Sequence, residues 1–552
     1  MNHKVSKYLF ATLAVFALPA LSFAQEQGLD ERIDAAFKPI ADAWEALVFF
    51  QAPLPEPFNL PIVLYLLIIG ATFFTVAFGF VNLRRFPLAL EVVRGKYDDI
   101  EMALDPDHKE PHADPQAEVK ISEEGDIART IRDEGHHGEV NHFQALATAV
   151  SGTVGLGNIA GVAIAVGIGG PGATFWMIVA GLLGMSSKFV ECTLGVKYRD
   201  IDSDGVVHGG PMYYLSRGFS ELKLAPIGKV LAVIFAIFCV GGALGGGNAF
   251  QANQATTQIT TMLGIGSGGA ARTVIGIIMA ILVAIVIIGG IKRIAKVTDK
   301  LVPLMAIIYI IASLIIILAH FTEIPAAIGM IISGAFTPEA GVGGIAGVII
   351  QGFRRAAFSN EAGAGSAAIA HSAVRTKYPA SEGLVALLEP FIDTVVICTM
   401  TAVVIVLFNM KGDFFMYGGE MLNGARSVVI DGQAVNGVDL TARAYNDVLP
   451  GFNAVLTVAI VLFAFSTMIS WSYYGLQSWK FLFGRSKVSD LTFKVIFCVF
   501  VVIGAAASLG SVLAFSDAMI LAMVFPNMIG LFFLFPRVRE ELVRYLKAIG
   551  KA

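Results

Sequence analysis

Charged residues are scarce in this chain: Asp, Glu, Lys and Arg make up 15% of its 552 residues, while hydrophobic residues make up 56%. A soluble domain is ordinarily about 25% charged and roughly 45–50% apolar. The composition therefore argues against a soluble globular protein and favours one that lies mostly within a lipid bilayer. The formal net charge of −4 shows no basic excess, so we expect no nucleic-acid partner.

Cysteine is also rare. The four cysteines stand far apart, each within an apolar segment: Cys192, Cys239, Cys398 and Cys498. A disulfide framework or a structural zinc site needs clustered cysteines, so we interpret these as packing residues. The chain also lacks a recognisable spaced set of nucleophile, base and acid, which argues against an enzyme. We expect no organic cofactor.

The first 24 residues have the pattern of a secretory signal peptide. Lys4 and Lys7 precede an apolar run over 8–21, and the small residues at 22–24 suit cleavage. The run of about 14 residues is short for a membrane span, which needs about 20. We therefore predict cleavage, with residues 25–57 as an external segment.

Eleven apolar segments follow that are long enough to be transmembrane helices. They lie at 58–83, 143–168, 172–197, 228–262, 272–291, 297–320, 345–373, 382–409, 451–482, 490–513 and 516–536. Lys and Arg concentrate in alternate loops, which by the positive-inside rule puts the N-terminus outside and the tail 541–552 in the cytoplasm. We predict a multi-pass protein of the bacterial inner membrane.

Residues 84–142 form a long polar insert on the predicted cytoplasmic side. The insert carries mixed charges and four histidines, His108, His112, His136 and His137. A metal site is one interpretation of these histidines. A solvated loop is the favoured interpretation.

Two of the predicted spans are interrupted by glycine and small polar residues. The stretch 151–158 reads SGTVGLGN and the stretch 358–366 reads FSNEAGAGS. Because each glycine costs about 1 kcal/mol relative to alanine in a helix, we expect both stretches to unwind. Unwound backbone at membrane depth is tolerated where it lines a cavity, and there it offers N–H groups to anions and carbonyls to cations. Close helix packing is the alternative for either stretch alone.

Each break begins a set of five predicted spans, 143–320 and 345–540. An odd number of spans repeated along the chain gives the second set inverted topology, which is typical of secondary transporters. The predicted fold class is therefore an all-α membrane protein with eleven transmembrane helices. It contains a five-plus-five inverted repeat and one extra N-terminal helix at 58–83.

Several motifs resemble those of the sodium:alanine symporter family, also called the alanine or glycine:cation symporters. They are GTVGLGNIAGVA at 152–163, GGPGATFWM at 169–177, GGGNAFQANQ at 245–254, FSNEAGAGSAAIAHS at 358–372 and FSTMISWSYYG at 465–475. The resemblance covers approximately residues 55–540. It implies a fold like that of the bacterial leucine transporters. It also implies import of a small neutral amino acid, alanine or glycine, with sodium as the coupling ion.

The resemblance places a zwitterionic substrate where the two breaks meet. Its carboxylate would accept hydrogen bonds from backbone N–H groups near Thr153, Val154 and Gly155. Its ammonium group would face carbonyl oxygens around Phe358 and Ser359. These backbone groups are therefore expected to bind the substrate.

Three side chains are candidates to complete that site. Gln251 is the main candidate, and Gln254 is the second because residues three apart share a helix face. Hydrogen bonding between helices is the alternative for both glutamines. Trp471 is expected to cap the substrate and restrict its size, with a place at the membrane interface as its alternative.

The resemblance also implies a sodium site. Neighbouring hydroxyls in an apolar span would join carbonyl oxygens in a five-oxygen cage from Ser151, Val154, Phe463, Ser466 and Thr467. Bonding of the hydroxyls to their own helix is the alternative. Asn158 is a weaker candidate for a second ion near the substrate. Since neither hydroxyl titrates at a useful pH, sodium is favoured over protons.

Ionisable residues within spans are costly, so they are usually functional or paired. This chain has Arg354, Arg355, Glu361, Glu389 and Asp393 in such positions. A pair between Arg355 and either Glu361 or Asp393 would form a gate, and plain structural pairing is the alternative.

Two other functions stay open. One is an amino-acid-binding membrane sensor without transport, and the other is a proton-coupled amino-acid transporter. The sequence leaves the oligomeric state open, with a monomer as the working expectation.

Overall fold

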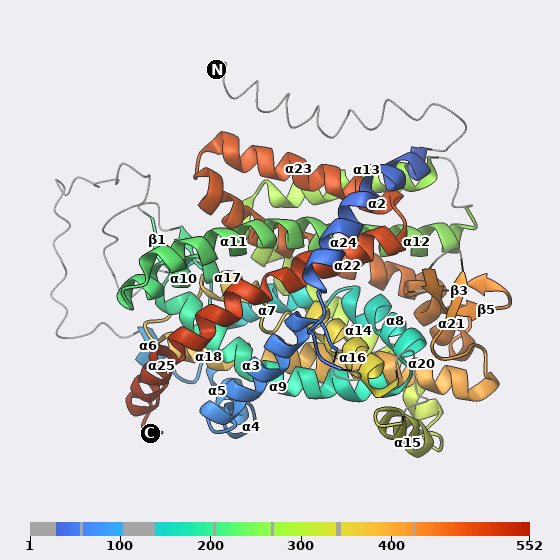
Figure 1. Ribbon diagram of the computed structural model, residues 1–552, viewed down its shortest axis with the longest axis horizontal. Coiled ribbons are helices and arrows are strands. Elements are labelled where there is room, and N and C mark those ends of the chain that lie inside the picture. Colours follow the sequence, from blue (N-terminus) through green and yellow to red (C-terminus); the bar gives the residue numbers. More distant parts are fainter. Residues whose placement is uncertain are drawn as a thin grey trace.

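The computed structural model describes residues 29–55, 59–102, 138–202, 206–265, 270–337, 344–422, 425–435 and 437–551. Over these residues the chain is almost wholly helical (Figure 1). The predicted signal peptide at 1–24 and the four insert histidines lie outside them, so those interpretations stay predictions.

The predicted external segment, residues 25–57, contains a helix that the sequence pattern did not predict. This helix, α2 (Leu29–Val48), lies alongside α24 (Leu509–Ala522), and the rings of Phe37 and Phe515 meet edge to face at 5.2 Å (Figure 1). The apolar helix α3 follows at Ile62–Ala77. Three short helices complete this region: α4 (Val81–Arg84), α5 (Phe86–Val93) and α6 (Asp98–Met102).

The first predicted set of five spans begins with a broken helix. Its elements are α7 (His142–Thr153), the π-helical turn η2 (Gly157–Gly161), α8 (Val162–Gly169), α9 (Gly172–Lys197), β1 (Asp200–Ile201), β2 (Val207–His208), α10 (Pro211–Glu221), α11 (Ala225–Leu244), the π-helical turn η3 (Gly245–Ala249), α12 (Phe250–Leu263), α13 (Ala271–Ile287) and α14 (Gly290–Ala319). The set is followed by α15 (Ile324–Gly334), which lies beyond its bounds of 143–320. Strands β1 and β2 form a short antiparallel hairpin.

The second set begins with its own broken helix. Its elements are α16 (Gly344–Asn360), α17 (Ala367–His371), α18 (Pro379–Ala386), α19 (Leu388–Pro390), the π-helical stretch η4 (Phe391–Cys398), α20 (Thr399–Gly412), β3 (Glu420–Leu422), β4 (Ala425–Ser427), β5 (Val429–Ile430), β6 (Gln433–Ala434), α21 (Val438–Val448), α22 (Asn453–Phe483), α23 (Lys487–Ala506), α24 and α25 (Val524–Ala548). The four short strands form two antiparallel hairpins, β3–β4 and β5–β6.

Within the described residues, seven helical stretches are long and apolar enough to cross a membrane, or eight if the bent pair α7 and η2–α8 counts as one span. The apolar helices α3 and α13 have 16 and 17 residues, so they fall short of that length. The prediction of a helical, multi-pass membrane protein is confirmed at this level, and the count of eleven stays a prediction.

The outer face of α13 shows how the chain meets lipid. Large aliphatic side chains on it are about half exposed or more: Val274, Ile278, Ile281, Ile285 and Ile288. A contiguous apolar stripe of this kind would be unfavourable in water, whereas hydrocarbon chains cover it without cost.

Both predicted breaks interrupt helices in the structure. The axis bends by 50° between α7 and the η2–α8 stretch. In the second break, φ is positive at Glu361, Gly363 and Gly365, with values of 56°, 90° and 90°. A left-handed backbone ends a helix, and glycine adopts it without a Cβ clash, so the sequence of this break accounts for its shape.

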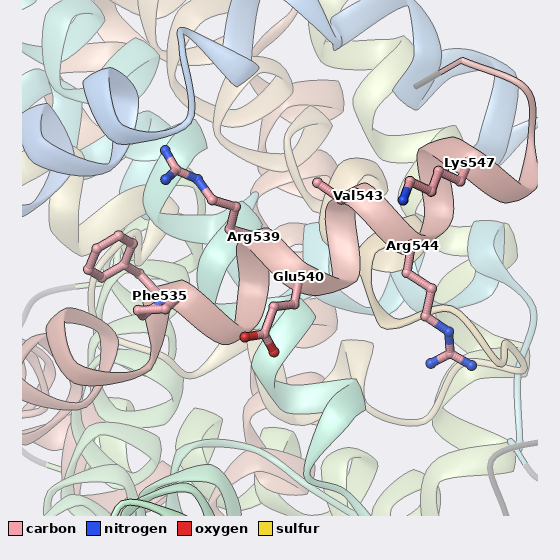
Figure 2. A pocket seen from close by; sticks show the side chains of 7 residues that line it. Phe535, Arg539, Glu540, Val543, Arg544 and Lys547 are labelled. Carbon is pink, nitrogen blue, oxygen red and sulfur yellow. The ribbon is translucent and has the colours of Figure 1, made fainter.

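A hollow of about 710 Å³ lies along the C-terminal part of α25 (Figure 2). Its lining comes from one helix: Phe535, Pro536, Arg539, Glu540, Val543, Arg544 and Lys547. The lining contains none of the predicted substrate or sodium residues, which lie instead at and around the two breaks.

Candidate functional site

The structure brings most of the predicted sodium cage together where α7 ends beside α22. The hydroxyl of Thr467 donates to the carbonyl oxygen of Ser151 at 3.1 Å, and the Ser151 hydroxyl donates to the carbonyl of Ser466 at 3.0 Å. The Ser466 hydroxyl donates to the carbonyl of Phe463 at 2.9 Å. All four residues are buried. The cluster is therefore rich in uncharged oxygen atoms, the ligands that hard cations prefer.

Val154, the fifth cage residue, ends α7 and is fully buried. Its ψ of 89° takes its carbonyl out of the helical direction. A carbonyl oxygen released in this way from the helix ladder is free to serve a ligand.

Gln251 of α12 reaches the first break, as the resemblance implied. Its side-chain oxygen accepts a hydrogen bond from the Leu156 N–H at 3.0 Å, and its amide donates to the Gly246 carbonyl at 2.9 Å. The Gly155 N–H is bound by the side-chain oxygen of Asn158 at 2.8 Å. A substrate carboxylate would therefore compete with two side-chain carbonyl groups for the N–H groups of this break.

Gly155 lies between the candidate ion cage and Gln251. A Cβ at this position would lie 2.3 Å from the Thr467 hydroxyl and 3.2 Å from the Gln251 side-chain oxygen. Only glycine lets the three groups approach this closely. The Thr153 hydroxyl, by contrast, bonds to its own helix, at 3.2 Å to the Ala149 carbonyl.

Gln254 has other partners, although it lies only three residues from Gln251. Its side-chain oxygen accepts a hydrogen bond from the Val438 N–H at 2.9 Å, and its amide donates to Asn253 at 2.9 Å. Gln254 therefore fixes the start of α21 beside α12, which agrees with the alternative of hydrogen bonding between helices.

Trp471 connects the two breaks. Its indole N–H lies 3.2 Å from the carbonyl oxygen of Gly152 in the first break and 3.0 Å from a carboxylate oxygen of Glu361 in the second. The side chain is only 2% exposed and packs on Gly247 in η3, where a Cβ would lie 2.2 Å from the ring. A place at the membrane interface does not fit this burial.

A buried carboxylate from η4 contacts both breaks, through Asn158 of the first and Ser359 of the second. Asp393 of η4 accepts hydrogen bonds from Asn158 at 2.6 Å, from Ser359 at 2.8 Å and from Thr394 at 2.7 Å. Among the described residues these donors are neutral, and no salt bridge to Asp393 is present. An unpaired buried carboxylate is costly, so this group is suited to bind a cation or a proton.

Phe358 lies between the breaks on the apolar side. Its ring meets that of Phe250 edge to face with centroids 5.1 Å apart, and a Cβ on Gly157 would lie 3.5 Å from it. The predicted substrate residues Gly155, Gln251, Phe358, Ser359 and Trp471 thus all lie in the two breaks or in contact with them.

The predicted gate pairs of Arg355 with Glu361 or Asp393 are wrong. Arg355 forms its salt bridge with Asp517 of α24, which also binds Arg354 at 2.7 Å. Arg355 lies in the intact part of α16 facing α24, whereas Glu361 lies beyond the helix end. Asp517 was missed, although a lone carboxylate in the apolar run 509–522 was a usable signal.

The chain matches the model of the sodium:alanine symporter family over residues 119–552. It is 36% identical to the sodium/alanine symporter AgcS of Methanococcus maripaludis over 475 residues, covering 86% of this chain and 92% of that relative. It is 32% identical to the amino-acid carrier protein AlsT of Bacillus subtilis over 480 residues, covering 86% and 87% of the two chains.

Among solved structures, the crystal structure of MhsT in complex with L-phenylalanine is similar with a TM-score of 0.45 and 15% identity, covering 73% of this chain and 100% of that one. The family match and the AgcS relative both span most of this chain. On these grounds the chain belongs to the sodium:alanine symporter family, whose members are transporters and not enzymes.

Proposed function

We propose that this protein is a sodium-coupled symporter that imports alanine or glycine across the bacterial inner membrane. The observation that carries the proposal is the contact of Thr467 with Ser151 beside Gly155. This contact supports an ion cage at the end of α7, next to the N–H groups proposed to bind the substrate.

Coupling follows from that shared segment. A sodium ion held by Ser151, Val154, Phe463, Ser466 and Thr467 would fix the end of α7 against α22. The Gly155 and Leu156 N–H groups would then be ordered before the amino acid arrives. Because coupling between two ligands is reciprocal, the amino acid must raise sodium affinity by the same factor.

A small substrate suits the groups that surround the breaks. Trp471, Phe358 and Phe250 are buried and packed, with glycine at positions 246 and 247 beneath the rings. A longer side chain would have to displace these rings. Alanine and glycine need the least displacement.

Asp393 is proposed as the charged ligand of a second cation, with Asn158 and Ser359. In this assignment Asn158, the weaker candidate for a second sodium ion, binds that ion together with Asp393. A proton-coupled carrier is the second candidate function, and the same residue favours it, because Asp393 is a titratable group between the breaks. Eleven spans, the inverted repeat, an external N-terminus and a monomeric state belong to the proposal.

Uptake of labelled alanine into proteoliposomes tests the function. We expect uptake to require an inward sodium gradient. When potassium replaces sodium and a proton gradient is imposed, uptake should be absent. Uptake driven by protons alone would support the second candidate. Sodium-dependent binding without any flux would point to a sensor.

A further inference from the structure

A continuous row of buried ionisable side chains leads from α6 into the helix bundle. It runs through Glu101, His142, Glu382, His371, Glu389 and Lys188. Glu101 lies 2.7 Å from His142, His371 lies 2.5 Å from Glu382, and Lys188 lies 3.1 Å from Glu389. None of these side chains is more than 7% exposed. Neither the ion cage nor the substrate region uses any of them.

The two contacts of His142 show that the row requires an added proton. One ring nitrogen faces a carboxylate oxygen of Glu101 and the other faces Glu382. A carboxylate only accepts hydrogen bonds, and a neutral imidazole has a single N–H to donate. Both contacts are satisfied only when one extra proton lies on the ring or on a carboxyl group.

The charge balance leads to the same requirement. The row contains three carboxylates, two histidines and one lysine. With both histidines neutral it would bury an excess of two negative charges, whereas protonation of both makes it neutral. Buried charge that is not balanced is expensive, so the packed arrangement favours the protonated histidines.

Other charged groups face the row from each neighbouring element. Arg199 donates to carbonyl oxygens around 372–376, and Tyr545 of α25 donates to Glu101 at 2.7 Å. On α9, Glu191 lies one turn beyond Lys188 and is bonded by Asn527 at 2.9 Å. Glu361 is bonded by Trp471 and Ser366. Tyr545, Thr376 and Ser381 donate to Glu101. The proton requirement at His142 stays in place, because each of its ring nitrogens still faces a carboxylate oxygen.

The row also joins elements from both predicted repeats, 143–320 and 345–540. His142 is the first residue of α7, the half-helix that ends at the first break. Its partners lie on α6 and α18, and the row continues through α17, α19 and α9. Movement of α7 away from this side would pull His142 out of its place between Glu101 and Glu382.

We propose that closing the α7 side of this carrier binds a proton at His142, between Glu101 and Glu382, and that opening it releases the proton. The inference rests on the proposed function in one respect: sodium binding is taken to favour the closed arrangement of α7. In water, a histidine is mostly neutral above a pH of about 6.5, so the proton must be taken from solution.

Calorimetry on the purified full-length protein tests the proposal. Sodium and alanine are added at a pH of about 8 in buffers with different heats of ionisation, and the dependence of the measured heat on the buffer gives the number of protons taken up. We expect the wild-type protein to take up protons, to a limit of about one at this site. The uptake should fall as the pH is lowered through about 6.5, where the open form already holds the proton.

The variant His142→Gln should bind alanine with sodium and lose this uptake. His320→Gln is the matched control, because His320 bonds only to the Ile316 carbonyl within α14 and should leave the uptake unchanged. If His142→Gln fails to fold, Glu101→Gln serves in its place, because removal of one carboxylate also removes the need for the proton.

The outcomes separate the two proposals. Sodium-dependent alanine binding with no proton uptake in the wild-type protein overturns this inference and leaves the proposed function intact. Equal uptake by wild type, His142→Gln and Glu101→Gln also overturns it. Alanine binding that ignores sodium overturns the proposed function instead.

Discussion

The hydroxyl of Thr467 donates to the carbonyl oxygen of Ser151 at 3.1 Å, across 316 residues of sequence. This bond joins α22 to the last turn of α7 before the first break. It makes the sodium proposal open to a direct test, because the Thr467 hydroxyl can be removed without changing the shape of the side chain.

Thr467→Val should raise the sodium concentration needed for half-maximal alanine uptake by about tenfold or more, since loss of one polar partner in a buried site costs about 1–3 kcal/mol. The measurement is uptake against sodium concentration. Thr492→Val is the matched control, because Thr492 is exposed and bonds only to the Val488 carbonyl of its own helix. Equal sodium dependence in both variants would remove Thr467 from the ion site.

Gln251→Leu should lower alanine affinity by about tenfold or more at saturating sodium, because the variant lacks the buried amide proposed to bind the substrate, and this loss outweighs the release of the Leu156 N–H from competition. Binding is measured by calorimetry. Gln258→Leu is the control on the same helix, since Gln258 bonds to Asn453 and Thr457 instead. An unchanged affinity in Gln251→Leu would exclude Gln251 from the substrate site.

Gly247→Ala should abolish transport while the protein still inserts and folds. The new Cβ would lie 2.2–2.5 Å from atoms of Trp471, so the ring must move away from Gly152 and Glu361. Gly510→Ala is the control, because a Cβ there meets nothing within 4 Å. Initial rates of alanine uptake decide the matter, and wild-type rates in Gly247→Ala would contradict the role given to Trp471.

Asp393→Asn should lower the number of sodium ions coupled to each amino acid. Asn158 and Ser359 donate to different oxygens of Asp393, so the neutral amide keeps an oxygen for only one of them, and it removes the charge that a second cation needs. The steepness of uptake against sodium concentration, measured at fixed alanine, should decrease. A proton-coupled mechanism predicts instead that Asp393→Asn removes the pH dependence of uptake and leaves the sodium response unchanged.

Asp200→Asn should destabilise the protein at neutral pH and have little effect in acid. Burial alone would raise the pKa of Asp200, but the hydrogen bond from Arg485 at 2.8 Å and the charge of Arg217 outweigh it and hold this pKa below its ordinary value. A lowered pKa gives stability that is present above about pH 4 and is lost as the pH falls through the folded-state pKa.

Thermal unfolding in detergent at several pH values checks this expectation. The melting temperatures of wild type and Asp200→Asn should differ most near pH ~7 and converge below pH ~4. Asp431→Asn is the control, because the Asp431 side chain is 91% exposed and 4.0 Å from Arg443. A gap between wild type and Asp200→Asn that stays constant with pH would contradict the ion-pair explanation.

The two helix breaks could be predicted from the sequence because glycine acts locally. The clusters at 151–158 and 358–366 weaken the helix whatever lies around them, and the structure unwinds at both. The cage of Ser151, Ser466 and Thr467 needed more than local chemistry, because Ser151 lies more than 300 residues before the adjacent pair Ser466 and Thr467. Family resemblance supplied that pairing, and the structure brings the residues together.

Side-chain partners were harder to predict than helix breaks. Gln251 and Gln254 share a helix face by spacing, yet one binds the break and the other binds the start of α21. The difference arises because α21 packs against α12, and nothing in the residue spacing of α12 predicts that contact. Arg355 was assigned the wrong partner for the same reason, since its carboxylate comes from α24.

The two hydrogen bonds of Trp471 affect when the two halves of the chain move. Gly152 and Glu361 belong to half-helices from opposite halves of the chain, and a single indole N–H lies within reach of both. A shift of either segment would move the indole ring and so change its hydrogen bond to the other segment. Trp471 therefore makes the two halves of the chain move together. Without it, the two halves should move slowly and independently of each other.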